Sequence, residues 1–297
     1  MTTLKVSNLK KHFGGVKALD GVSFEVKTGE CVALIGPNGA GKSTCFATLA
    51  GQHRPDAGTV EWGDEPALQN ITGRSAAALS QLGIGRTFQV AQVFEALTVL
   101  QNLQLAEQQI HGPARVLGAL LPLKRLPTTA QQILLDQLGL GQVAHTQALL
   151  LPYGLKKRLE LGIALTPRPQ LLLLDEPAAG LAQAERHELM ALIKSLTNSS
   201  IYASTYATTY ASTQPSLPPN GLARAGHQPI AVLYTEHNMD AVFGVADRVL
   251  VLIDGQLAAQ GTAAQVKANP LVRQRYLGGD SSGVKSLQPT AVEVTHG

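Results

Sequence analysis

The sequence has little that marks a disulfide-bonded or membrane-spanning protein. Its 297 residues include two cysteines, Cys31 and Cys45, which cannot form a disulfide framework and fit a reducing compartment. The longest apolar runs, such as 171–174 and 249–253, are as long as a strand. They fall far below the roughly 18–20 residues that a membrane-spanning helix needs. Any role at a membrane is therefore expected to be peripheral.

The chain also has no strong net charge, and a leader segment is not expected. The formal net charge is +3 and there is no block of five or more consecutive basic residues, which argues against nucleic acid as a partner. The chain opens on alternating apolar positions around Leu4, and no secretory signal is expected before them.

What is present is typical of a globular α/β protein. Apolar residues make up 44% of the chain and charged residues 15%, which is enough for an ample core. Strands are expected at 4–7, 22–26, 31–35, 58–61, 171–174, 230–235 and 248–253. Helical patterns follow several of them, at 42–50, 183–196 and 239–245. Strands that alternate with helices predict an α/β domain with a largely parallel sheet.

The middle third of the chain has a different pattern. Between 89 and 149 the residues are rich in leucine and glutamine, notably at 99–109 and 130–138, and no convincing strand is found. This predicts a helical subdomain inserted into the α/β core.

The segment 197–229 is different again. It contains three tyrosine-led tetrapeptides from Tyr202 to Thr213 and then a stretch rich in proline and glycine. Most connections inside a domain run only about 4–6 residues. Two interpretations stay open: a disordered surface insertion, or a partner-binding or regulatory element that uses tyrosines four residues apart. The polar tail at 279–297 is expected to be loosely held.

A phosphate-binding loop is the strongest motif. The nine residues that match G-x-x-x-x-G-K-[ST], and are expected to bind ATP, are Gly36, Pro37, Asn38, Gly39, Ala40, Gly41, Lys42, Ser43 and Thr44. The motif follows an apolar strand and precedes a helix, so backbone N–H groups and the helix N-terminus face the phosphates. Lys42 can reach the β- and γ-phosphates, and the Ser43 hydroxyl can ligate Mg²⁺.

Acidic and imidazole side chains follow two other predicted strands. Asp175 and Glu176 come directly after 171–174, at the end of the strand where ligands of open α/β sheets bind. Asp175 is predicted to hold the Mg²⁺ shell, and Glu176 to polarise the water that attacks the γ-phosphate. His237 ends another strand and is predicted to contact the γ-phosphate.

In this order, the motifs resemble the nucleotide-binding subunit of ABC transporters over about residues 4–278, apart from the insertion. Phe13 matches the aromatic that stacks on adenine, and Gln89 matches the glutamine that senses Mg²⁺ and the γ-phosphate and links to the permease. Tyr153 and Gly154 stand where the signature motif binds the ATP held by a second subunit. The run 178–181 matches the D-loop, and His237 matches the switch histidine.

The resemblance implies a fold and an assembly. The fold is a P-loop NTPase cassette with a mixed or parallel RecA-like core at 1–88 and 165–278, an N-terminal antiparallel β-subdomain and a helical subdomain at about 89–164. The implied cofactors are ATP and Mg²⁺, with Ser43, Gln89 and Asp175 at the metal. The implied partners are a second ATP-binding subunit, identical or different, membrane permease subunits and, indirectly, a periplasmic solute-binding protein. The implied location is the cytoplasmic side of the bacterial inner membrane.

The likeness is greatest to the branched-chain amino-acid importer branch, through 86–89, 151–154, 176–180 and the C-terminal 269–278. Urea and short-chain amide importers are similar in the same places, and the ATPase subunit does not contact the substrate in this family. The substrate therefore stays open between these classes.

Three positions depart from the family pattern. Pro152 replaces the signature serine, Leu155 replaces the polar residue that ends the motif, and Ala182 lacks a polar side chain after the D-loop. They leave two further alternatives: a subunit that binds ATP but hydrolyses it poorly beside an active partner, and an ABC ATPase outside transport. The latter usually has tandem cassettes or long coiled-coil insertions, and this chain has neither.

Overall fold

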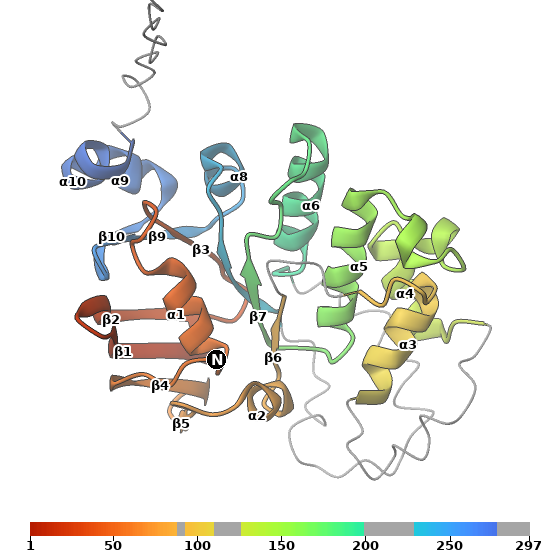
Figure 1. Cartoon of the computed structure of the whole chain (residues 1–297), viewed down its shortest axis with the longest axis horizontal. Coiled ribbons are helices and arrows are strands. Elements are labelled where there is room, and N and C mark those ends of the chain that lie inside the picture. Colours follow the sequence, from red (N-terminus) through yellow and green to blue (C-terminus); the bar gives the residue numbers. More distant parts are fainter. Residues whose placement is uncertain (88–92, 110–125, 199–228, 278–297) are drawn as a thin grey trace, which may run out of the picture.

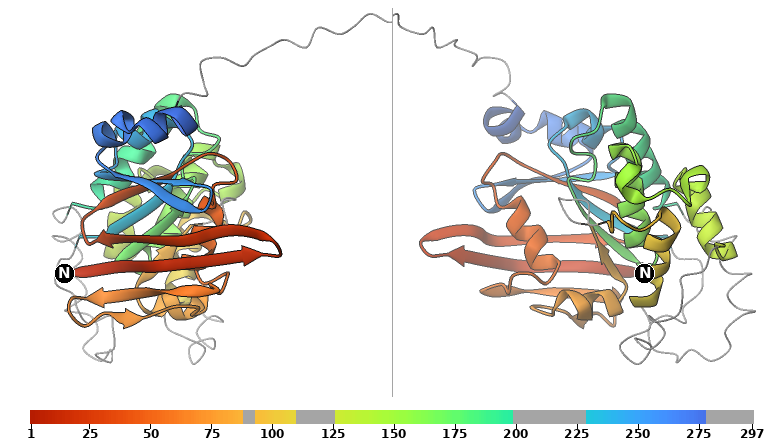
Figure 2. Two further views of the ribbon diagram at one scale, coloured as in Figure 1. Left: turned by 90° about the vertical axis from the view of Figure 1, so that its left-hand side faces the viewer. Right: turned by 45° about the vertical axis from the view of Figure 1, so that its right-hand side comes forward.

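Alternating polar and apolar residues at the N-terminus build an antiparallel sheet, sheet A. The computed structural model describes residues 1–87, 93–109, 126–198 and 229–277. Sheet A has the strand order β2-β1-β4-β5, with β1 at Thr2–Phe13, β2 at Val16–Lys27, β4 at Ala57–Asp64 and β5 at Gln69–Asn70. Two glycines join β1 to β2, and the tip of this hairpin reaches past the other strands of the sheet (Figure 2).

The apolar runs predicted as strands form a second sheet, sheet B. Its strand order is β10-β9-β3-β8-β7-β6. The strands are β3 (Cys31–Ile35), β6 (Ile84–Arg86), β7 (Leu171–Asp175), β8 (Ala231–Thr235), β9 (Arg248–Ile253) and β10 (Gln256–Gly261). All neighbouring pairs are parallel except β9 and β10. The mixed sheet confirms the predicted fold class.

The two faces of sheet B carry different layers. Val32 and Leu34 of β3 belong to a cluster shared with sheet A and with helices α1 (Lys42–Leu49) and α2 (Ala76–Gln81). Cys31, Ala33 and Ile35 face a second cluster. That cluster is shared with α3 (Val99–Gln109), α4 (Thr129–Gln137), α5 (Tyr153–Leu165), α6 (Gln183–Ser195) and α8 (Met239–Phe243). Because both faces are covered, the strands β3, β7, β8 and β9 of sheet B are apolar over most of their length.

The helices of the middle segment lie together. Figure 1 shows α3, α4 and α5 grouped at one side of the molecule, away from sheet A. Short helices complete the described chain: η2 (Gly141–Val143), η3 (Ala148–Leu150), α9 (Ala263–Ala268), α10 (Pro270–Val272) and the π-helical η4 (Arg273–Leu277). Within the four described ranges, no helix is long and apolar enough to cross a membrane.

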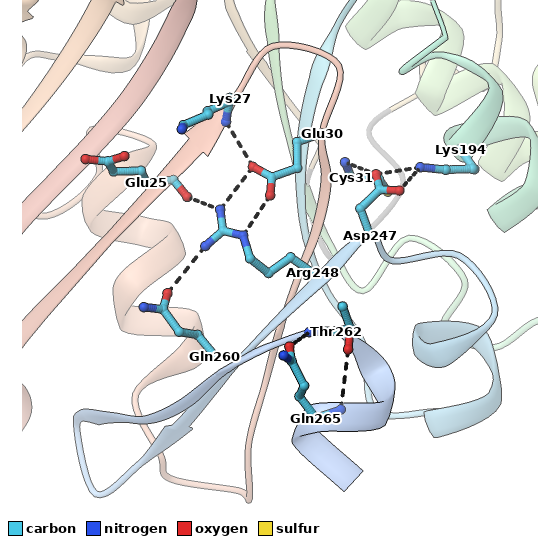
Figure 3. A network of polar contacts seen from close by, with 10 residues as sticks. All are labelled: Glu25, Lys27, Glu30, Cys31, Lys194, Asp247, Arg248, Gln260, Thr262 and Gln265. Carbon is cyan, nitrogen blue, oxygen red and sulfur yellow. Dashed lines mark hydrogen bonds and ion pairs between the residues drawn. The ribbon is translucent and has the colours of Figure 1, made fainter. Parts of the chain in front are cut away.

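Polar residues fasten the layers at the edge where sheet A meets sheet B (Figure 3). Arg248 of β9 donates from Nε and Nη2 to the two carboxylate oxygens of Glu30, at 2.7 and 3.0 Å. The neighbouring Asp247 accepts the N–H of Cys31 at 2.9 Å and pairs with Lys194 of α6. Asp247, directly before β9, and Arg248, its first residue, therefore hold the start of β3 and a helix of the opposite layer.

Most predicted elements agree with the structure, and β3, β9 and α3 have the predicted bounds. The sequence analysis did not predict α2, α5, β6 and β10. Strand β6 is short, exposed polar residues interrupt the apolar pattern of α2 and β10, and charged residues such as the buried Lys157 and Glu160 interrupt that of α5. Gln89, residues 199–228 of the insertion and the whole tail at 279–297 lie outside the described residues.

Candidate functional site

The phosphate loop, between β3 and α1, packs so closely against the backbones of β9 and β2 that two of its positions require glycine. A Cβ atom on Gly36 would lie 2.0 Å from the carbonyl oxygen of Leu252, and one on Gly41 would lie 2.2 Å from that of Ala18. Gly39 has a φ of +80° but open space around it. Packing against β9 therefore explains the glycine at position 36, and packing against β2 the glycine at position 41. The backbone conformation explains Gly39.

The start of α1 presents unpaired backbone donors. Gly41 is the N-cap residue, in the left-handed conformation, and it supplies no side-chain oxygen to the first turn. The first N–H groups of a helix have no partner within the helix and carry its partial positive charge. An anion such as a nucleotide phosphate can satisfy these donors. The loop and the helix start therefore fit the predicted triphosphate.

Lys42 lies across the same loop. Its Nζ atom donates to the carbonyl oxygens of Gly36 and Pro37 at 2.7 and 3.0 Å. Burial lowers the pKa of this ammonium, and the nearby carboxylates of Glu176 and Asp175 oppose that shift. The phosphate loop and the two predicted acids therefore share one electrostatic environment.

Asp175 and Glu176 are fastened to the neighbouring strand by a threonine. The hydroxyl of Thr235 donates to Oδ1 of Asp175 at 2.6 Å and accepts the backbone N–H of Glu176 at 3.0 Å. Glu176 has a φ of +49°, a conformation that is uncommon outside glycine. The threonine therefore helps to hold an unusual backbone turn directly after β7.

His237 completes this cluster. Its Nε2 atom lies 2.6 Å from Oε1 of Glu176. Asp175 and Thr235 are partners in the parallel pairing of β7 with β8, so the residues that follow them leave the sheet side by side. The structure thus brings together the two residues that the sequence predicts as catalytic.

Glu236 is a buried acid that the sequence analysis missed. Its side chain accepts the N–H of Ala178 at 2.9 Å and the N–H of His237 at 3.3 Å, and the residue is 4% exposed. Burial raises the pKa of this carboxyl, and the two N–H groups partly oppose the rise. Two polar residues, Thr235 and Glu236, at the end of an apolar strand were the signal that could have revealed it.

The signature segment lies against the D-loop of the same chain. Tyr153 begins α5 behind the N-cap Pro152, and a Cβ on Gly180 would lie 3.1 Å from its ring. A Cβ on Gly154 would lie 2.6 Å from Oε1 of Glu185. Helix α5 packs on the face of sheet B opposite α1. The signature segment and the phosphate loop of the same chain therefore do not lie together.

The departures from the family pattern have local consequences. Leu155 is half-buried and packs against the core cluster of the helices. Ala182 is the N-cap of α6 and offers no side-chain oxygen, so the first turn is capped only by Glu185, whose Oε2 accepts the Ala182 N–H at 3.3 Å.

The predicted Mg²⁺ donors are oxygen atoms, which this cation prefers. Ser43 is exposed and Asp175 is half-buried, while Gln89 falls outside the described residues. Across those described, no group of three or more histidine, cysteine or acidic side chains is placed to hold a metal.

The fold agrees with comparisons to known proteins. The profile of the ABC transporter family matches residues 19–179. The high-affinity branched-chain amino acid transport ATP-binding protein LivG of Escherichia coli K12 is 34% identical over 93% of this chain and 97% of that protein. BraF of Pseudomonas aeruginosa, with the same description, is 32% identical over the same shares. The chain belongs to the ABC transporter family, as one of its ATP-binding cassettes.

Solved structures give the same result. An ATP-binding cassette of an ABC transporter in its ADP conformation superposes with a TM-score of 0.71 and 29% identity, covering 94% of this chain and 99% of that one. A dimeric bacterial ABC transporter cassette, 20% identical with a TM-score of 0.63, shares the fold.

Proposed function

We propose that this chain binds and hydrolyses ATP to energise an importer of branched-chain amino acids. The observation that carries the hydrolytic part is the contact of His237 with Glu176 beside the phosphate loop. The substrate class is supported by relatives with that description whose length the chain covers almost completely.

In this proposal each described group has one task. The phosphate loop and Lys42 bind the triphosphate, and Phe13 stacks on the base. Glu176 accepts a proton from the water that attacks the γ-phosphorus, while the bond from that phosphorus to the β-phosphate oxygen breaks and yields ADP and phosphate. His237 holds the Glu176 carboxylate and contacts the γ-phosphate. Bound Mg²⁺ would neutralise charge on the phosphates, held by Ser43, Asp175 and Gln89.

A second ATP-binding subunit is part of the proposal. Helix α5 packs on the face of sheet B away from α1. Tyr153 at its start is 47% exposed, so the signature segment can meet the ATP of a partner subunit. A solved cassette of the same fold is described as dimeric. Closure on ATP would assemble both sites, and hydrolysis would let them part. Permease subunits and a periplasmic solute-binding protein complete the importer, at the cytoplasmic face of the membrane.

Three other functions differ from the proposed one in their substrate, activity or partner. A urea or amide importer would use the same site with another solute-binding protein. In a subunit that hydrolyses ATP poorly, Leu155 in the signature motif would be the cause of the low activity. An ABC ATPase outside transport would need no permease. The near-complete overlap with transport subunits favours the importer over the last of these.

The test is co-purification followed by transport. The chain is purified with the permease subunits encoded beside it and reconstituted with their solute-binding protein. Leucine, isoleucine or valine should stimulate ATP hydrolysis and enter the vesicles, whereas urea should do neither. Stimulation by urea alone would assign the amide branch. ATP hydrolysis that appears only when a second, different cassette is added would assign the hydrolysis-poor role.

A further inference from the structure

The ring of Phe13, at the tip of the β1–β2 hairpin, is held by the loop that follows α1. His53 of that loop meets the ring edge-on, with centroids 5.4 Å apart and an interplanar angle of 75°. Phe13 is 46% exposed, so the contact leaves a large part of the ring accessible. Such aromatic pairs stabilise beyond the area they bury.

A carboxylate of the same loop fixes the backbone next to the ring. Oδ2 of Asp56 accepts the N–H of His12 at 2.6 Å, and Oδ1 accepts from Nζ of Lys11 at 3.0 Å. That ammonium in turn lies 5.4 Å from the centroid of the Phe13 ring. The N–H of Asp56 also donates to the carbonyl of Lys10 at 2.9 Å. The three residues before Phe13 are each tied to one acidic side chain and its backbone.

The loop is itself anchored to the helix of the phosphate loop. The N–H of His53 donates to the carbonyl of Ala47 in α1 at 3.2 Å. Helix α1 begins at Lys42, so one short helix joins the phosphate loop to the loop that holds the hairpin.

We propose that His53 and Asp56, the hairpin brace, are positioning residues that fix the Phe13 ring for the base of the nucleotide. The inference rests on the proposed function, in which Phe13 stacks on adenine. The hairpin tip contains two adjacent glycines and reaches beyond the sheet, so an unbraced ring would lose conformational freedom on stacking. The brace removes that cost before the nucleotide arrives, which is preorganisation.

The experiment separates base binding from phosphate binding. Calorimetry on the full chain measures the Kd of ADP and of inorganic pyrophosphate, with Mg²⁺, for wild type and for His53→Ala, His53→Phe, Asp56→Asn, Phe13→Ala and the Phe13→Ala/His53→Ala pair. His145→Ala, an exposed histidine elsewhere, is the matched control. Thermal melts check that each variant folds.

His53→Ala should weaken ADP binding about three- to tenfold and leave pyrophosphate binding unchanged, since an aromatic contact contributes about that factor. Asp56→Asn should also weaken ADP binding alone, because a neutral amide holds the His12 N–H and the Lys11 ammonium less strongly than the carboxylate does. His53→Phe should retain ADP affinity, because it keeps the edge contact. The Phe13→Ala/His53→Ala pair should have the same Kd for ADP as Phe13→Ala alone, because the brace acts only through the Phe13 ring.

Equal weakening of ADP and pyrophosphate, or additive losses in the double variant, would overturn the brace. The brace would also be overturned if His53→Ala keeps the ADP affinity of the wild type while Phe13→Ala has a reduced ADP affinity. If Phe13→Ala itself leaves the ADP-to-pyrophosphate ratio unchanged, the stacking role and the brace both fail while nucleotide binding stands. A wild-type chain that binds neither probe would refute the proposed function itself.

Discussion

Nε2 of His237 lies 2.6 Å from Oε1 of Glu176, although 61 positions separate the two residues in the chain. The parallel pairing of β7 with β8 brings them together, because it aligns Asp175 with Thr235. The Glu176 side chain is 25% exposed and that of His237 is 47% exposed, so both can still be reached by substrate and water. This pair is the centre of the predictions on hydrolysis.

Replacing Glu176 by glutamine should preserve nucleotide binding and remove turnover. The amide has nearly the same shape but cannot accept the proton of the attacking water, so kcat should fall by about 10²- to 10⁴-fold. Steady-state ATPase assays and ATP binding on the same preparation check both halves. Full activity in Glu176→Gln would remove this residue from the role of base.

His237→Ala should also lower kcat, since it removes the partner that holds the Glu176 carboxylate. The same ATPase assay measures this loss.

Thr235 should matter through its hydroxyl. Thr235→Val removes both the donor to Asp175 and the acceptor for the Glu176 N–H. The site is buried, so the free energy of unfolding should fall by about 1–3 kcal/mol. The value of kcat should fall more than the affinity for ATP. Thr235→Ser keeps the hydroxyl and is the matched control; equal kcat losses in both variants would argue that the methyl group, and not the hydroxyl, is what matters.

The glycines of the phosphate loop should differ in their tolerance of alanine. Gly36→Ala places a Cβ 2.0 Å from a backbone oxygen and should prevent stable folding or cost several kcal/mol. Gly39→Ala meets no atom within 4 Å and should cost only the roughly 1–2 kcal/mol of a left-handed conformation. Denaturant unfolding of the two variants measures the difference. Similar losses would show that the close approach of β9 does not limit position 36.

The stability of the wild type should depend on pH through Glu236. In the unfolded chain this carboxyl titrates near its ordinary pKa of 4.5, and burial raises the pKa in the folded chain. The folded state therefore binds the proton more tightly, and this stabilisation is lost as pH rises through the folded pKa. The free energy of unfolding, taken relative to Glu236→Gln, should fall as pH rises above 4.5 and then level off. A difference that grows with pH would mean that the two N–H donors outweigh burial.

Much of the site could be predicted from sequence because each motif is local. The phosphate loop, Asp175, Glu176 and His237 each follow an apolar strand, and a strand end is visible in the order of residues. Thr235 and Glu236 were not predicted, because their partners lie about 60 positions away, Asp175 at the end of β7 and Ala178 in the turn that follows it.

The alternation of strands and helices, the phosphate loop and the family follow from the order of residues, since local periodicity and motif spacing are properties of the chain. Three relationships are visible only in the folded chain: α1 and α5 pack on opposite faces of sheet B, His237 contacts Glu176, and His53 contacts Phe13. These relationships depend on strand register and on which face of the sheet each helix covers. Register and face are set by the packing of the whole core, which no single segment of the sequence contains.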